Sequence, residues 1–237
     1  MPVDFLTLQP AEWQALLLTL KVASAALLVV LPLAILVAYV LARYRFPGHG
    51  IVNALVHLPL VLPPVVTGYV LLLMFGRKGP VGAFLADNFG ISFAFNWMGA
   101  ALAAGVMAFP LMVRPIRLSF EAVDPKLEDA AKSLGAYRIV AFLTITLPLA
   151  LPGILGGAIL GFAKAMGEFG ATITFVSNIP GETRTLALAI YTATQSPGGD
   201  VAAFRMTLVA TFVAFAALIA SELLARRLRR GIGGGHA

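Results

Sequence analysis

The sequence contains no cysteine and only three histidines, and charged residues make up only 12% of its 237 positions. Without cysteine there are no disulfides or thiolate metal sites, and His49, His57 and His236 are too scattered to predict a metal cluster. Hydrophobic residues are abundant, at 59% of the chain with a mean hydropathy of +0.92. This exceeds the usual apolar share of a soluble domain. The composition therefore predicts an all-α integral membrane protein.

A membrane-spanning helix needs about 20 mostly apolar residues. Five windows meet this need, at residues 13–42, 51–75, 97–113, 145–166 and 201–224. Proline, glycine and charge interrupt the apolar pieces at 172–191, which favours a partly inserted loop over a sixth span. We therefore expect one transmembrane domain, residues 1–237, with a cytoplasmic loop at 114–144 and an external loop at 168–200.

Lysine and arginine predict the orientation, because short cytoplasmic loops are enriched in both. Eleven of the seventeen basic residues follow the first, third and fifth windows, namely Arg43, Arg45, Arg114, Arg117, Lys126, Lys132, Arg138, Arg226, Arg227, Arg229 and Arg230. The segment before the first window carries Asp4 and Glu12 and no basic residue. We expect an external N-terminus, a cytoplasmic C-terminus and a first window that remains as an anchor.

Residues 124–135 have the signals of a short helix within the cytoplasmic loop. Asp124 can cap its N-terminus, Pro125 suits the first helical position, and Gly135 is a plausible stop. Its apolar residues follow the i, i+3, i+4, i+7 spacing and form one narrow stripe, Leu127, Ala130, Ala131 and Leu134. Such a stripe suits insertion into a groove of a partner; packing on lipid or against the protein's own bundle is the alternative.

The residues from Asp129 to Pro148 read Asp-Ala-Ala, three residues, Gly, nine residues, Ile, one residue, Leu-Pro. This pattern resembles the cytoplasmic signature of ABC importer permeases, which begins with Glu, at six of its seven positions. The departure is Asp129, and the adjacent Glu128 offers a second carboxylate. In that family the helix docks into a cleft of a separate ATPase subunit. The resemblance implies coupling residues Leu127, Glu128, Asp129, Ala130, Ala131, Leu134, Gly135 and Pro148.

The absence of a phosphate-binding G-x-x-x-x-G-K-[ST] loop agrees with a motor on another chain. The sequence also has no grouped nucleophile, base and orienting residue, so we expect a non-catalytic subunit rather than a membrane enzyme.

Prolines in the second window predict a kinked or locally unwound helix, because each one removes a backbone donor. Freed carbonyls in a membrane must face protein or a water-filled cavity, so this helix could line a transport pathway. The alternative is that the kink serves only helix packing. With the charged stretch after the fourth window, the kink suggests pathway residues Pro63, Pro64, Thr67, Gly167, Glu168 and Phe169. Lys164, Arg184 and Arg205 could attract an anion to the outer mouth.

The spacing of Gly153, Gly157 and Gly161 predicts close helix packing, either within the bundle or between two copies of the chain.

Longer stretches, including LPPVVTGY and GRKGP, resemble molybdate permeases, whereas GEFG is shared with sulfate and thiosulfate permeases. The resemblance implies a type I ABC importer in the bacterial inner membrane. It would contain two copies of this chain, two ATPase subunits that bind ATP and Mg²⁺, and an external molybdate-binding protein. We expect no cofactor, metal or nucleic acid on this chain. The alternatives are a sulfate, thiosulfate or tungstate permease and, in a different class, a secondary anion transporter.

Overall fold

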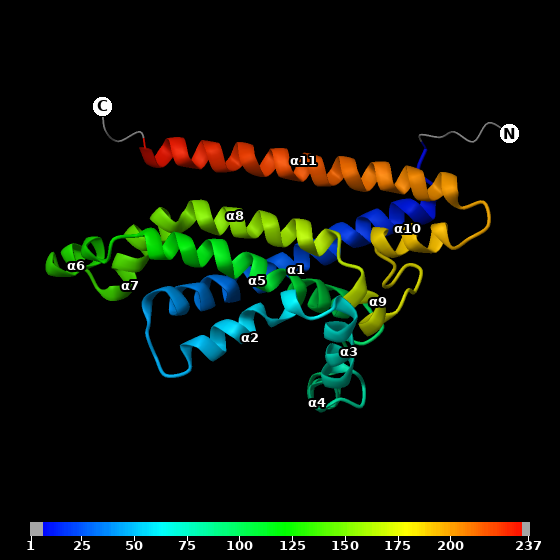
Figure 1. Ribbon diagram of the computed structural model, residues 1–237, viewed down its shortest axis with the longest axis horizontal. Coiled ribbons are helices and arrows are strands. Elements are labelled where there is room, and N and C mark those ends of the chain that lie inside the picture. Colours follow the sequence, from blue (N-terminus) through cyan, green and yellow to red (C-terminus); the bar gives the residue numbers. More distant parts are fainter. Residues whose placement is uncertain (1–6, 234–237) are drawn as a thin grey trace.

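The computed structural model describes residues 7–233, which form helices and connecting loops without a strand (Figure 1). Asp4 and His236 lie outside the described residues. The helices are α1 (Pro10–Arg43), α2 (His49–Val61), α3 (Pro64–Phe75), α4 (Pro80–Phe89), α5 (Trp97–Ala122), α6 (Pro125–Ser133), α7 (Arg138–Ala141), α8 (Leu147–Met166), α9 (Gly170–Val176), α10 (Leu186–Thr194) and α11 (Asp200–Gly233), with a π-helical segment, η1 (Phe142–Thr146), before α8.

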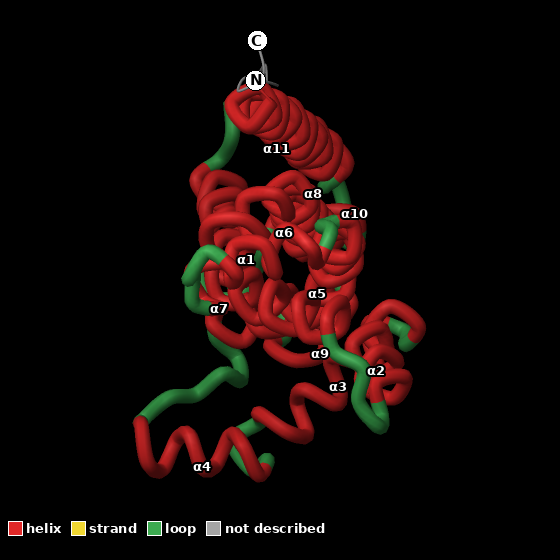
Figure 2. The backbone as a smooth tube through the Cα atoms, turned by 90° about the vertical axis from the view of Figure 1, so that its left-hand side faces the viewer, coloured by secondary structure: helices red, strands yellow, loops and turns green. Residues whose placement is uncertain are grey.

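Helices α1, α5 and α8 pack side by side and form the centre of the molecule, as Figures 1 and 2 show from two directions. Alanines bring α1 and α5 close together, with Ala23, Ala26, Ala100 and Ala104 almost fully buried. Close backbone approach of this kind is how helices pack without large side chains in a membrane. We call the end of the bundle that carries α6 the α6 end and the opposite one the α10 end.

The face of α8 that carries Gly153, Gly157 and Gly161 lies against α5. A Cβ atom at Gly153 would lie 2.8 Å from Pro115 O, and one at Gly157 would lie 2.8 Å from Met112 O. At Gly161 it would overlap the Met112 side chain, whereas at Gly156 it would meet nothing within 4 Å. Within this chain, the spacing of four therefore permits contact between α8 and α5.

The predicted kink in the second window is confirmed. Helices α2 and α3 meet at an angle of 114°, with Leu62 and Pro63 between them. Pro63 precedes α3 and Pro64 begins it, because a proline at the first position loses no helical hydrogen bond. Four helices of the described residues are long and apolar enough to cross a membrane, or up to five if this bent pair counts as one. That number fits the five windows of the sequence.

Two segments differ from their expected form. Helix α5 continues nine residues past position 113, so Arg114 and Arg117 lie on a helix and not in a loop. The reason is packing, because Ile116 and Phe120 are completely buried against α1 and α8. The expected external loop at 168–200 contains α9 and α10, which are seven and nine residues long and pack into the bundle.

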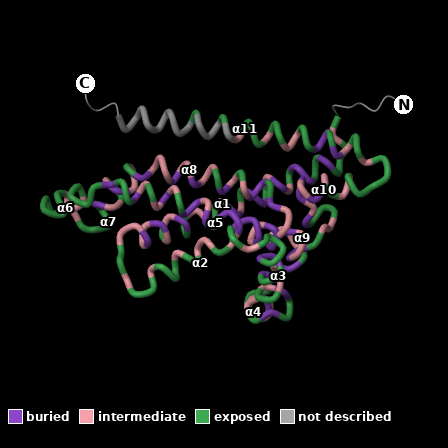
Figure 3. The backbone as a smooth tube through the Cα atoms, in the orientation of Figure 1, coloured by how far each residue is buried: buried purple, intermediate pink, exposed green. Residues whose placement is uncertain are grey.

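A buried ion pair joins α1 to α11 near the α10 end. Arg205 Nε donates to Glu12 Oε2 at 2.9 Å, and both side chains are about 95% buried. The charge of Arg205 is therefore neutralised inside the protein and does not lie at an outer mouth. Figure 3 shows that exposed residues are frequent on α2, α3, α4, α6 and the part of α11 whose burial is given.

Candidate functional site

Helix α6 has the local structure that its sequence predicts. The Asp124 carboxylate accepts a hydrogen bond from Lys126 N at 2.9 Å, and Pro125 occupies the first turn. At the other end Gly135 adopts φ +92°, a conformation that favours glycine. Gly135 N donates to Lys132 O at 2.9 Å and Ala136 N to Ala131 O at 3.0 Å, which together form a Schellman motif.

The apolar stripe of α6 is not covered by the rest of the chain. Leu134 is 90% exposed and Leu127 is 46% exposed, and Ala130 between them is exposed as well. The helix contributes no buried residue to the protein. An apolar ridge that is held in a fixed conformation but left uncovered is suited to contact with another surface.

The two adjacent carboxylates of α6 lie in different environments. The Glu128 side chain is only 14% exposed and turns towards the bundle, whereas that of Asp129 is 71% exposed. Asp129 pairs with Lys132 across one turn, at 3.0 Å. Glu128 belongs to the protein's own interior contacts, and Asp129 is the carboxylate that faces outwards.

Glu128 ties α6 to two other segments. Arg43 at the end of α1 contacts Glu128 Oε1 at 3.4 Å, and Thr146 Oγ1 in η1 donates to the same oxygen at 2.5 Å. Arg43 also donates to Val123 O at 3.1 Å, just before α6. Thr146 is completely buried, so its hydroxyl requires an acceptor. Through one carboxylate, α6 is attached to both α1 and the start of α8.

The π-helical segment places Thr146 opposite Glu128. Such segments are rare, and they often occur at functional sites. Leu147 and Pro148 follow at once and begin α8, with Pro148 half-buried in its first turn. Pro148 therefore follows two residues after Thr146, which donates to Glu128 of α6. Pro148 itself makes no hydrogen bond to α6.

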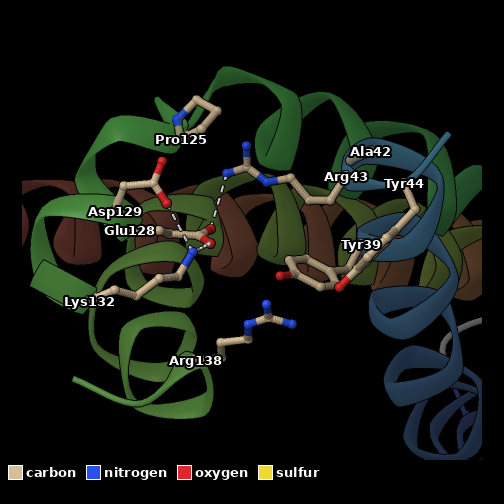
Figure 4. Close-up of a pocket in the computed structure, with 9 residues that line it drawn as sticks. All are labelled: Tyr39, Ala42, Arg43, Tyr44, Pro125, Glu128, Asp129, Lys132 and Arg138. Carbon is tan, nitrogen blue, oxygen red and sulfur yellow. Dashed lines mark hydrogen bonds and ion pairs between the residues drawn. The ribbon is translucent and has the colours of Figure 1, made fainter. Parts of the chain in front are cut away.

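A cavity of about 480 Å³ opens between α6 and the end of α1 (Figure 4). Figure 4 shows the Arg43 and Lys132 side chains on either side of Glu128, with Tyr39 and Arg138 across the cavity. Its charged groups are three cations and two carboxylates. It is an open, charged recess between the uncovered helix and the bundle.

The segments that carry the suggested pathway residues meet where α3 packs against α9. A Cβ atom on Gly170, directly after Phe169, would lie 2.8 Å from Pro64 Cβ. One on Gly68, next to Thr67, would lie 2.5 Å from Ala171 O. The Thr67 hydroxyl is buried without a hydrogen-bond partner among the described residues.

Glu168 has identifiable structural partners in this region. Its carboxylate accepts from Lys164 Nζ at 2.6 Å and from Ala171 N, in the first turn of α9, at 3.0 Å. Gly167 ends α8 immediately before it, and the Phe169 ring lies 5.1 Å from the Tyr191 ring. The Glu168 carboxylate thus joins the end of α8 to the first turn of α9.

The sequence did not identify Arg43 and Thr146 as members of the α6 site. Arg43 has no local motif, because its partner lies 85 residues away, and it entered only as a charge in the orientation pattern. Thr146 occupies the unspecified position between Ile145 and Leu147. The available signal for Thr146 was a polar residue inside the apolar window at 145–166.

Comparison with known proteins gives consistent results. Residues 30–230 match the family described as binding-protein-dependent transport system inner membrane component. The chain is 58% identical over 222 residues to the molybdenum transport system permease protein ModB of Escherichia coli K12, covering 94% of this chain and 97% of that protein. It is 38% identical over 161 residues to the sulfate transport system permease protein CysT of Salmonella typhimurium LT2, covering 68% and 58% of the two chains.

The fold also resembles solved structures. One is the crystal structure of a bacterial ABC transporter involved in the import of the acidic polysaccharide alginate, with a TM-score of 0.75 and 18% identity. The match covers 96% of this chain and 84% of that one. At this identity the likeness concerns the fold alone.

Proposed function

This chain belongs to the family of binding-protein-dependent transport system inner membrane components, and we propose that it is the permease subunit of an ATP-driven molybdate importer. It is a multi-pass protein of the bacterial inner membrane and a non-catalytic subunit. Molybdate is favoured over sulfate because the similarity to ModB is higher and spans nearly the whole of both chains, whereas the match to CysT is lower and partial.

The observation that supports coupling to a separate ATPase is the uncovered ridge of α6. The helix is capped at both ends and attached to the bundle through Glu128, yet Leu127 and Leu134 are exposed. We propose that this ridge, with Ala130, Ala131 and the outward-facing Asp129, docks into the ATPase, while Gly135 and Pro148 fix the ends of the connecting segment. ATP and Mg²⁺ would bind to that partner.

The proposed assembly contains two copies of this chain, two ATPase subunits and an external molybdate-binding protein. The α6 end would face the cytoplasm and the α10 end would face outwards, as the distribution of lysine and arginine favours. Helix α2 supports pairing of two copies, because it contributes no buried residue to the single chain. Its apolar side chains would then be shared between lipid and the second copy.

The proposed pathway includes the break between α2 and α3 and the segment that packs against it. Pro63, Pro64 and Thr67 supply a kink and an unpaired hydroxyl, and Gly167, Glu168 and Phe169 lie at the adjoining turn. Movement at this contact would open or close the outer half of the pathway. The close fit at Gly68 supports this proposal, since even one added methyl group would separate α3 from α9.

Reconstitution tests the proposal directly. The chain, its ATPase and its binding protein in proteoliposomes should import labelled molybdate only with ATP, and a large excess of sulfate should leave most of this uptake intact. Full competition by sulfate would contradict the molybdate assignment. Sustained uptake by this chain alone, driven by an ion gradient, would favour a secondary transporter instead.

A further inference from the structure

A second polar cavity lies between α2 and α5, apart from the α6 recess. Its volume is about 320 Å³, and it is lined by Asn53, His57, Arg114, Arg117, Leu118 and Glu121. His57 lies eight residues after the start of α2 and Arg114 eight residues before the end of α5. At about 1.5 Å per residue, each lies about 12 Å along its helix from the α6 end.

The cavity contains two arginines: Arg117, whose side chain is hydrogen-bonded, and Arg114, which forms no ion pair with the described side chains. Arg117 donates through Nη1 to Asn53 at 2.8 Å and through Nε to Glu121 at 2.7 Å. His57 Nδ1 lies 2.8 Å from Asn53 O. Arg114 is exposed and forms no ion pair with any side chain that the structure describes. The groups that bridge α2 and α5 are satisfied, and a guanidinium remains available beside them.

The available donors suit an oxyanion. Two guanidinium groups against one carboxylate leave a net positive charge, which disfavours a cation. Guanidinium groups present paired N–H donors that match the oxygens of phosphate-like anions. At about 30 Å³ per water molecule, the cavity has room for about ten waters, and so for a small anion that keeps part of its hydration shell.

We propose that this cavity is a transient binding site for a tetrahedral oxyanion, with Arg114 as its principal ligand and Arg117 as a second, fixed contact. That the anion is the cargo, molybdate, rests on the proposed import function. The site would receive the anion in the half of the pathway nearest the α6 end. Binding there must be weak, because a transported ion has to leave again.

A phospholipid phosphate has the same chemistry as a free tetrahedral oxyanion, so the experiment must separate the two sources. The chain has no native cysteine, and Leu118 on the cavity wall is 58% exposed. Leu118→Cys in the purified complex would be labelled with a neutral maleimide. The labelling rate would be measured in the presence of either millimolar molybdate or added anionic phospholipid. Leu143→Cys, 53% exposed on η1 outside the cavity, is the control site.

Molybdate should slow labelling at position 118 and not at position 143. Adding Arg114→Gln should weaken this protection at least about tenfold, as expected for a lost charged hydrogen bond. Arg45→Gln, an exposed arginine beyond the end of α1, removes the same charge and should leave protection unchanged. Protection by anionic phospholipid alone would overturn the cargo site in favour of a lipid site, and protection by neither would overturn the site altogether.

Uptake by the reconstituted complex separates failure of the site from failure of the function. Arg114→Gln should import less molybdate per ATP hydrolysed, with normal assembly. If the parent complex imports molybdate but the anion never protects position 118, the site fails and the import function stands. If the parent complex imports no molybdate, the function fails whatever the labelling shows.

Discussion

Replacing Glu128 with glutamine removes one negative charge and preserves the size of the side chain. Replacing Asp129 with asparagine does the same one residue further along α6. Glu128 is 14% exposed and bonded to Thr146 and Arg43, whereas Asp129 is 71% exposed and pairs only with Lys132. The two variants therefore form a matched pair that separates attachment of α6 to the bundle from contact of α6 with a partner.

The magnitudes follow from burial. A hydrogen bond to a charged group contributes about 1.5–3 kcal/mol, and Glu128→Gln also leaves the largely buried Arg43 side chain without its counter-charge. We expect the attachment of α6 to weaken by about 2 kcal/mol. Asp129→Asn removes an exposed ion pair, which contributes about 0.5 kcal/mol or less.

Labelling of a buried cysteine measures this attachment. Ala141 on α7 is completely buried and α6 packs against α7, so a maleimide reaches Ala141→Cys only when this region opens. A loss of about 2 kcal/mol corresponds to a labelling rate about 30-fold higher for Glu128→Gln, against at most about twofold for Asp129→Asn. Asp129→Asn should instead reduce co-purification of the ATPase. Equal labelling rates in the two variants would refute the assigned roles of both carboxylates.

Three further results are expected. Gly157→Ala should lower the thermal stability in detergent by the equivalent of about 1–3 kcal/mol, because its methyl group meets a carbonyl of α5; Gly156→Ala, which meets nothing, should not. Glu12→Ala and Arg205→Ala should each destabilise the protein by about 3 kcal/mol or more, and the double variant by less than their sum, measured as a double-mutant cycle; additivity would contradict the pair. Gly135→Ala should cost about 1 kcal/mol through its positive φ and weaken ATPase assembly; unchanged assembly would count against the proposed docking segment.

Helix α6, the proposed ATPase contact, was predictable because its sequence signals are local. Asp124, Pro125 and Gly135 lie within 12 residues, and each acts through its own backbone geometry. The kink at Pro63 and Pro64 was predictable for the same reason. Helix geometry set by a cap or a proline needs no knowledge of the rest of the chain.

The residues that sequence reasoning missed depend on distant contacts. Arg43 and Thr146 belong to the α6 site only because folding brings α1 and η1 to the same carboxylate. Arg205 carries a charge that the sequence presents as free, yet its partner lies 193 residues earlier. The glycines of α8 predicted a close contact, but only the fold identifies α5 as the neighbouring helix within the chain.

The contacts of α1 explain how one helix can relate the two ends of the molecule. Its last residue, Arg43, contacts α6 through Glu128, and its first turn contacts α11 through the pair between Glu12 and Arg205. The helix is continuous over 34 residues, about 51 Å, so displacement of one end requires movement of the other unless the helix bends at Pro32. The ion pairs at its two ends therefore make α1 a physical connection between the proposed ATPase contact and the opposite end of the bundle.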